Sequence, residues 1–179
     1  MFKEIKVRKI FNALFTVVIL TSAFITNAQA KLQLEVNIPR LQVAEYHKPY
    51  VAIWIEDQQR KATQVAVWYD FEMKNQKGEE WLADLRQWWR RDGRKLSLPI
   101  DGVTGATKGP GAHLIRVDLE ALLKAQKPGK YKIRVEAARE VGGRELIELP
   151  ITLPLNAATL PLTATGKREL GKIQLTAIK

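Results

Sequence analysis

Two segments of the sequence, Tyr50–Ile55 and Val65–Tyr69, are apolar throughout and rich in β-branched and aromatic side chains. Segments of this kind favour β-strands, and a strand without a polar face must be covered on both sides. A polar stretch from Glu56 to Lys61 separates the two segments and predicts a hairpin between them. The chain must therefore bury a central hairpin between two layers, which constrains its fold more than any other feature.

Shorter segments with alternating polarity predict further strands around this hairpin. In the segment 31–38 every second residue is apolar, which is typical of a half-buried strand. More strands are expected at 113–119, 130–139, 144–153 and 172–178, with turns at 141–143 and 163–167 and a helical turn at 120–126. Pro150 and Pro154 indicate that the strand 144–153 lies at an edge or bends. These elements predict a mainly β fold, an immunoglobulin-like antiparallel β-sandwich.

One segment has helical periodicity instead. From Glu79 to Arg91, large apolar residues recur at spacings of three and four: Trp81, Leu82, Leu85, Trp88 and Trp89. This stripe predicts one inserted aromatic-rich helix, which Gly93 would end. We expect the helix to cover the second face of the hairpin, so that its tryptophans share one core region with Trp54 and Trp68.

The first 30 residues are typical of a secretory signal peptide. Four bases and one acid precede an apolar run from Ile10 to Thr26, and Ala28-Gln29-Ala30 offers small residues to a signal peptidase. The alternative is an uncleaved membrane anchor, but the run is about 17 residues and interrupted, whereas a spanning helix needs about 20. We therefore expect cleavage before Lys31, a periplasmic location, no stable transmembrane span after cleavage, and a single β-sandwich domain over residues 31–179.

The mature composition excludes several classes of function. Removing residues 1–30 takes four of the 29 bases and one of the 19 acids, which leaves a net charge of +7. This charge favours anionic partners only non-specifically, and no nucleic-acid-binding motif is present. There is no cysteine, the only histidines are His47 and His113, and Ser97 is the only serine after the signal peptide. The two histidines lack the spacing of metal ligands, so we expect neither a metal site nor an enzyme.

The segment Asp101-Gly102-Val103-Thr104-Gly105-Ala106-Thr107 is the one with chemical specificity. It resembles the acceptor motif for covalent flavin attachment in subunits of sodium-pumping quinone reductases and related extracytoplasmic electron-transfer proteins. In those families an exported flavin transferase moves FMN from FAD onto the last threonine through a phosphoester bond. The resemblance implies that Thr107 is the FMN acceptor and that Asp101, Thr104, Gly105 and Ala106 are the recognition positions.

A second resemblance extends over most of the mature chain. Its ordered motifs are Tyr50-Val51-Ala52-Ile53-Trp54-Ile55-Glu56-Asp57, Trp68, Trp81-Leu82-Ala83-Asp84-Leu85-Arg86-Gln87-Trp88-Trp89, the segment 101–107, Gly129-Lys130-Tyr131 and Val135-Glu136-Ala137-Ala138-Arg139-Glu140. This order is similar to that of a family of predicted periplasmic proteins of unknown function. Members tend to be associated with flavin transferases and with membrane reductases of the type linked to iron uptake, which the resemblance suggests as partners.

The physics of the 101–107 segment allows two interpretations. Its glycines and the following Gly109-Pro110-Gly111 would give an exposed, pliable loop that a transferase can take into its active site. The same residues would equally build a long surface turn without any modification. No residue near Thr107 in sequence is an obvious base for its hydroxyl, so we expect the transferase to supply that base. A basic cluster before the loop, Arg86, Arg90, Arg91, Arg94 and Lys95, would hold an FMN phosphate or form a solvated helix face, and the second is favoured.

Two hypotheses of function follow. The first is a non-enzymatic exported redox carrier with FMN esterified to Thr107, since a chain with so few reactive side chains needs a cofactor for redox chemistry. The second is a flavin-free β-sandwich that binds a partner protein or a small ligand in the periplasm. An enzymatic activity of its own is the third and weakest, because fold alone does not settle function.

Overall fold

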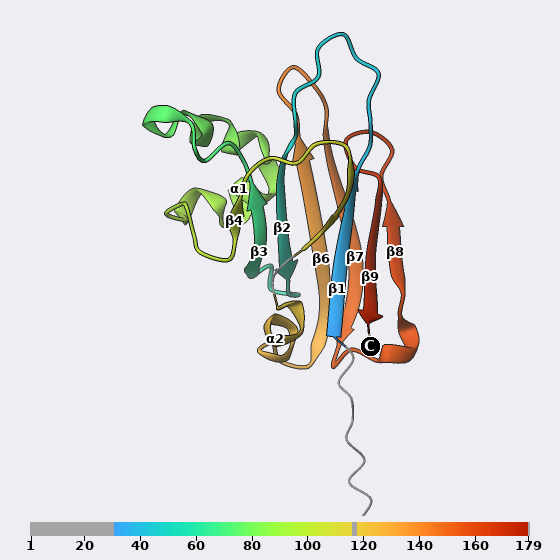
Figure 1. Ribbon diagram of the computed structural model, residues 1–179. Helices are drawn as coiled ribbons and strands as arrows, with labels where there is room; N and C mark the ends of the chain where they lie inside the picture. The colour runs from blue at the N-terminus through green and yellow to red at the C-terminus, as the bar shows by residue number, and fades with distance from the viewer. Residues whose placement is uncertain (1–30, 116–117, 179) are drawn as a thin grey trace, which may run out of the picture.

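The computed structural model describes residues 31–115 and 118–178, and this part of the chain is mainly β (Figure 1). Its strands are β1 (Lys31–Ile38), β2 (Tyr50–Glu56), β3 (Ala62–Trp68), β4 (Thr104–Gly105), β5 (Gly111–Leu114), β6 (Gly129–Ala138), β7 (Arg144–Leu153), β8 (Leu162–Thr165) and β9 (Lys172–Ile178). The helical elements are the α-helices α1 (Arg86–Arg91) and α2 (Leu119–Lys124) and the 3₁₀-helices η1 (Lys74–Asp84), η2 (Gly93–Lys95) and η3 (Ala157–Thr159).

The strands form two sheets. One has the order β5-β1-β9-β8 and the other has the order β4-β3-β2-β6-β7. All neighbours are antiparallel except β3 and β4, which run parallel. The strand β7, which carries Pro150, lies at the edge of the larger sheet, as its prolines predicted. The predicted boundaries of β7 and β9 are confirmed.

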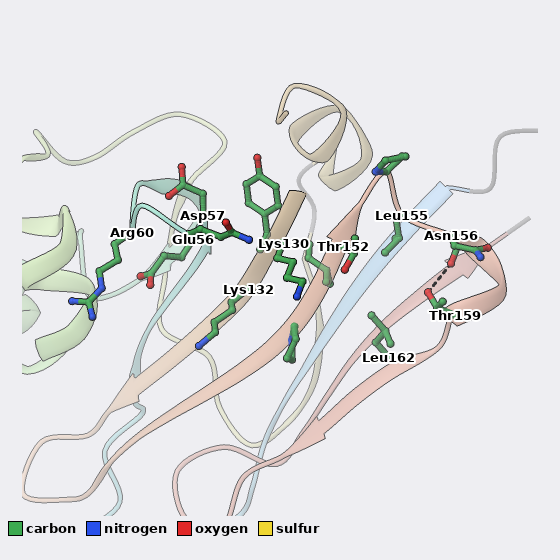
Figure 2. Close-up of a pocket in the computed structure, with 15 residues that line it drawn as sticks. Glu56, Asp57, Arg60, Lys130, Lys132, Thr152, Leu155, Asn156, Thr159 and Leu162 are labelled. Atoms are coloured by element: carbon green, nitrogen blue, oxygen red, sulfur yellow. Dashed lines mark hydrogen bonds between the residues drawn. The ribbon is translucent and has the colours of Figure 1, made fainter. Parts of the chain in front are cut away.

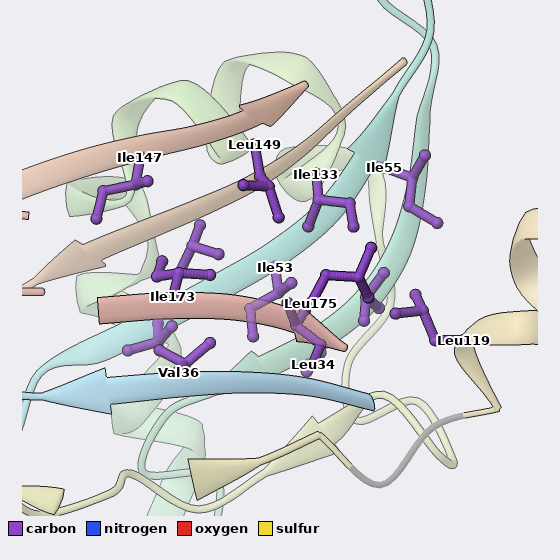
Figure 3. Packing of buried hydrophobic residues seen from close by; sticks show 14 of the residues in the cluster. Leu34, Val36, Ile53, Ile55, Leu119, Ile133, Ile147, Leu149, Ile173 and Leu175 are labelled. Atoms are coloured by element: carbon purple, nitrogen blue, oxygen red, sulfur yellow. The ribbon is translucent and has the colours of Figure 1, made fainter. Parts of the chain in front are cut away.

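The inner faces of the two sheets share the main hydrophobic core (Figure 3). Leu34 and Val36 on β1 and Leu175 on β9 meet Ile53 on β2 and Ile133 on β6, all at most 1% exposed. Each strand contributes alternate residues to this layer because successive side chains point to opposite faces. The mainly β prediction is confirmed, and the arrangement is consistent with a β-sandwich.

A second, smaller core lies on the outer face of the larger sheet. Ala52, Trp54, Val67 and Tyr69 from the hairpin β2–β3 pack there against Leu82, Leu85 and Trp88. Every residue of β2 is buried, so the predicted hairpin with two covered faces is confirmed. The prediction that Trp68 shares one core region with the other tryptophans is wrong. The side chain of Trp68 lies in the main core, because side chains alternate along the strand and those of Val67 and Tyr69 point to the opposite face of the sheet.

The prediction of one continuous helix over residues 79–91 is wrong. The segment begins earlier, as the 3₁₀-helix η1, and is interrupted at Leu85 (φ −74°, ψ 65°) before α1 starts. The interruption has a tertiary cause, since the buried Glu136 carboxylate on β6 accepts hydrogen bonds from the backbone N–H groups of Gln87 and Trp88. These donors are free only at a helix start, so Glu136 fixes the start of α1.

Two strand predictions are also corrected. The strand expected at 113–119 is β5, Gly111–Leu114, and Leu119 instead begins α2, because the Asp118 side chain accepts a hydrogen bond from Ala121 N and caps that helix. The turn expected at 163–167 is largely the strand β8, whose Leu162–Thr165 pair with β9. The turn lies after it, closed by a hydrogen bond from Gly166 N to Gly171 O.

The predicted signal peptide, residues 1–30, lies outside the described residues. Within 31–115 and 118–178, no helix has the length and apolar character needed to cross a membrane.

Candidate functional site

The segment that resembles a flavin acceptor forms the edge of the larger sheet. Thr104 and Gly105 constitute β4, which pairs with Val67 and Trp68 of β3. The backbone N–H of Val67 donates to Val103 O (2.8 Å), and that of Tyr69 donates to Gly105 O (3.0 Å). The segment is therefore held at the sheet edge, in contrast to the pliable loop expected from its glycines.

Four of the five predicted site residues fall into two groups, two exposed to solvent and two in contact with the rest of the fold. Asp101 and Ala106 are exposed to solvent. The Thr104 hydroxyl accepts a hydrogen bond from Ile100 N (2.9 Å) and closes the turn that precedes β4. Gly105 lies against the Trp68 ring, where an added Cβ would come within 3.2 Å of Cδ1. Thr104 and Gly105 thus shape the segment, whereas Asp101 and Ala106 are available to another molecule.

Thr107, the predicted acceptor, has a specific partner. Its side chain is half-buried, and its Oγ1 donates a hydrogen bond of 2.8 Å to Oδ1 of Asp70. Asp70 follows β3 by two residues and Thr107 follows β4 by two residues, so the parallel register of Trp68 with Gly105 brings them together. No local pattern in the sequence predicts that Asp70 contacts Thr107, because 37 positions separate the two residues.

Thr107 and Asp70 also line a cavity of about 300 Å³ at this end of the sheet. Its wall contains two aromatic residues, Tyr50 and Trp81, and three basic residues, His47, Lys48 and Arg139. The remaining lining residues are Met73, Asp84, Ala138 and Glu140. The cavity thus combines a hydroxyl group, a carboxylate beside it, aromatic surface and charged side chains of both signs.

Ion pairs and burial set the electrostatics of this cavity. Arg139 binds the buried Glu169 through two hydrogen bonds of 2.9 and 3.2 Å. His47 lies between Glu45 (3.1 Å) and Glu140 (3.4 Å). Burial raises the pKa of Tyr50 to about 12, with opposing contributions from the Asp70 backbone, which lowers the pKa, and from the Asp70 charge, which raises it. Tyr50 therefore stays neutral at neutral pH.

The other candidates from the sequence do not join this site. None of the five residues of the predicted basic cluster lines the cavity at Thr107. Arg91 pairs with Glu56 (2.9 Å), and Arg86, Arg90, Arg94 and Lys95 are exposed, as expected of a solvated face. His113 contacts Gly109 O through Nε2 (2.7 Å) and packs edge-on against Trp68. Among the described residues, no group of three potential ligands is placed to hold a metal.

A larger cavity, of about 780 Å³, lies at the opposite end of the larger sheet (Figure 2). Its lining comes from the β2–β3 turn, β6, β7 and the segment between β7 and β8. Its charged lining residues are the bases Arg60, Lys130 and Lys132 and the acids Glu56 and Asp57, and Leu155 and Leu162 are among the apolar residues. No local sequence pattern signals this cavity, because it forms only where strands distant in the chain meet.

Comparison with known proteins now identifies the family. The family model described as "Predicted periplasmic protein (DUF2271)" matches residues 31–172. The chain belongs to this family. No curated protein and no solved structure matches the chain.

Membership of the DUF2271 family confirms the resemblance inferred from the ordered motifs. The matched region contains both cavities, the Asp70–Thr107 pair and all described strands up to the start of β9. The family description places the protein in the periplasm, in agreement with an exported chain. The family description assigns no activity.

Proposed function

We propose that this exported protein carries FMN covalently bound to Thr107 and acts as a non-enzymatic redox carrier for membrane reductases of the type linked to iron uptake. The observation that supports this proposal best is the Thr107 hydroxyl. It lies in an Asp-x-x-Thr-Gly-Ala-Thr segment at a sheet edge, contacts a carboxylate, and opens onto a cavity with aromatic and basic residues.

The residues around Thr107 fit the chemistry of an attached flavin nucleotide. Lys48 supplies positive charge for a phosphate, and the partly exposed Trp81 supplies aromatic surface of the kind on which a flavin ring stacks. The described residues include no cysteine, and the bound flavin would supply the electron-transfer chemistry. The exposed Asp101 and Ala106 remain accessible for recognition by an exported flavin transferase.

The attachment is tested by intact mass. The full chain is co-expressed with an exported flavin transferase and purified from the periplasm, beside Thr107→Ala, Thr107→Ser and the exposed control Thr163→Ala. We expect the unmutated protein, Thr107→Ser and Thr163→Ala to gain the mass of one esterified FMN, and Thr107→Ala to gain none. An unmutated protein without that mass gain would refute the proposal.

The 780 Å³ cavity supports a second function, a flavin-free module that binds a small ligand or a partner protein. The lining contains both basic residues and apolar residues, which suits a small amphipathic anion whose charge would pair with Lys130 or Arg60. Native mass spectrometry of the same periplasmic preparations separates the two functions. A colourless protein with a dissociable ligand favours this second function, and a ligand that survives denaturation favours the first.

Two finer assignments belong to the same proposal. We propose that the signal peptide is cleaved before Lys31, which N-terminal sequencing of the periplasmic protein would test. We also propose that the two packed sheets are immunoglobulin-like in the broad sense. An experimental structure compared with immunoglobulin domains would decide this assignment.

A further inference from the structure

We infer that Asp70 accepts the proton of the Thr107 hydroxyl during FMN attachment, so that this chain carries the base for its own modification. The inference rests on the proposed function and adds to it a catalytic residue that the acceptor motif does not contain. It starts from the 2.8 Å hydrogen bond in which Thr107 Oγ1 donates to Asp70 Oδ1. A general base must lie within hydrogen-bond reach of the proton that it takes, and Asp70 meets this condition.

Backbone contacts on both sides of Asp70 hold this residue in place. The parallel pairing of β3 and β4 holds the two backbones, with Tyr69 N bonded to Gly105 O just before both residues. On its other side, the Asp70 carbonyl accepts a hydrogen bond from Met73 N (3.1 Å), and Gly78 packs directly on it. The carboxylate is therefore in place before a transferase arrives, which reduces the entropy cost of aligning it.

The step balances with FAD as the co-reactant. The Thr107 oxygen forms an ester bond to the phosphorus of the FMN half, the pyrophosphate bond of FAD breaks, and AMP leaves. The hydroxyl proton passes to Asp70 and then to solvent. No oxidation or reduction occurs, and the transferase retains the tasks of binding FAD and stabilising the charge on its phosphates.

Other charged and titratable groups face the same cavity and have to be separated from Asp70 in any test. They are His47, Lys48 and Tyr50 around the start of β2, Asp84 at the end of η1, and Arg139 and Glu140 after β6. Glu140 contacts His47, and Arg139 contacts Glu169. Among the described residues, Asp70 is the carboxylate hydrogen-bonded to Thr107. Glu72, an exposed carboxylate two residues from Asp70 and outside the cavity lining, is the matched control.

The test measures single-turnover rates of FMN attachment to the full mature chain with purified flavin transferase and FAD. The variants are Asp70→Asn, Asp70→Glu, Asp70→Gly and the control Glu72→Gln. Asparagine can still accept the hydrogen bond but is a far weaker base, so Asp70→Asn should react on the order of 10²-fold more slowly. Asp70→Glu should recover part of the rate, and Glu72→Gln should react like the unmutated protein.

Chemical rescue distinguishes a base from a residue that only positions the hydroxyl. Asp70→Gly removes the carboxylate and leaves room for a small carboxylate from solution. We expect added formate and acetate to raise the rate of Asp70→Gly with concentration, the more basic acetate more strongly, and to leave the rate of the unmutated protein unchanged. Thermal unfolding checks each variant, and Asp70→Ser serves as a second variant if Asp70→Asn does not fold.

The outcomes are distinguishable. If the unmutated protein gains no FMN, both the proposed function and this inference fail. If the unmutated protein is modified and Asp70→Asn reacts at the same rate, Thr107 remains the acceptor and the role of Asp70 is refuted. A slow Asp70→Gly protein whose rate does not respond to added carboxylates also refutes a base, because it indicates positioning alone.

Discussion

At the scale of single residues, two carboxylates, the buried Glu136 and the half-buried Glu145, hold segments of the chain in place. Glu136 is fully buried, and it accepts hydrogen bonds from Gln87 N, from Trp88 N and from Arg144. Glu145 accepts bonds from the N–H groups of Lys167, Arg168 and Leu170 and so gathers the turn between β8 and β9. In both cases one acidic side chain satisfies several backbone donors that no strand or helix pairs.

Replacing Glu136 by glutamine should destabilise the protein by about 2–3 kcal/mol, because a neutral amide is a weaker acceptor and its NH₂ group opposes the helix N–H donors. Urea denaturation of the mature protein measures the change in the free energy of unfolding. The control is Glu120→Gln, which removes a partly exposed i,i+4 pair with Lys124 and should cost less than about 0.5 kcal/mol. Equal losses for both variants would contradict the anchoring role of Glu136.

At the scale of elements, η1 connects the aromatic core to the candidate site. Its Leu82 packs in the smaller core, and its Trp81 and Asp84 line the cavity at Thr107. Its Gly78 lies so close to the residue after β3 that an added Cβ would come within 2.1 Å of Asp70 O. Only glycine allows this approach of the two backbones.

Gly78→Ala should therefore displace either η1 or Asp70 and cost about 2 kcal/mol through overpacking. Thermal unfolding should show a lower Tm, and modification of Thr107 should slow together with it. Gly109→Ala is the matched control, since it lies near Thr107 and an added Cβ there meets no atom within 4 Å. A Gly78→Ala protein as stable and as readily modified as Gly109→Ala would show that η1 adjusts without moving Asp70.

For the whole molecule, the ionisable groups whose pKa values are shifted in the folded protein predict how stability depends on pH. Burial opposes the ionisation of Glu56, but hydrogen bonds from Trp54 and Arg134 and the charges of Arg134 and Arg91 outweigh it and lower the pKa of Glu56. Burial likewise opposes the ionisation of Glu145, and backbone N–H donors lower its pKa. Burial raises the pKa of Tyr46, Tyr50 and Tyr69.

The free energy of unfolding should therefore be largest at neutral pH and fall on both sides. Carboxyl groups with a lowered folded pKa stabilise the protein above their unfolded value of 4.5, and this stability is lost as the pH falls below it. Tyr50, with a raised folded pKa, contributes fully below 10.0 and loses its contribution between 10.0 and about 12. Denaturation across pH checks both limbs.

Tyr50→Phe isolates the alkaline limb, because phenylalanine keeps the ring and removes the ionisable hydroxyl. This variant should lose less stability than the unmutated protein when the pH rises above about 10. Its stability in acid should follow that of the unmutated protein. An unchanged alkaline limb would show that Tyr50 does not contribute to it.

Local sequence patterns predict most of the strands and the layer that covers them. The apolar hairpin β2–β3, the alternation in β1 and the bounds of β7 and β9 follow from such patterns, since side-chain polarity along a strand records which faces are buried. The ordered motifs also indicated the family, which is confirmed, and the acceptor role of Thr107 stays a prediction.

Contacts between residues far apart in the sequence follow from the tertiary structure and have no local sequence signal. Glu136 divides the expected helix because its carboxylate, 48 positions from Trp88, competes for the N–H groups there. Parallel pairing of β3 with β4 places Asp70 beside Thr107, and a parallel pair of such short strands leaves no local sequence signal. Local patterns therefore determine which residues are buried, whereas strand register determines which buried and polar groups meet.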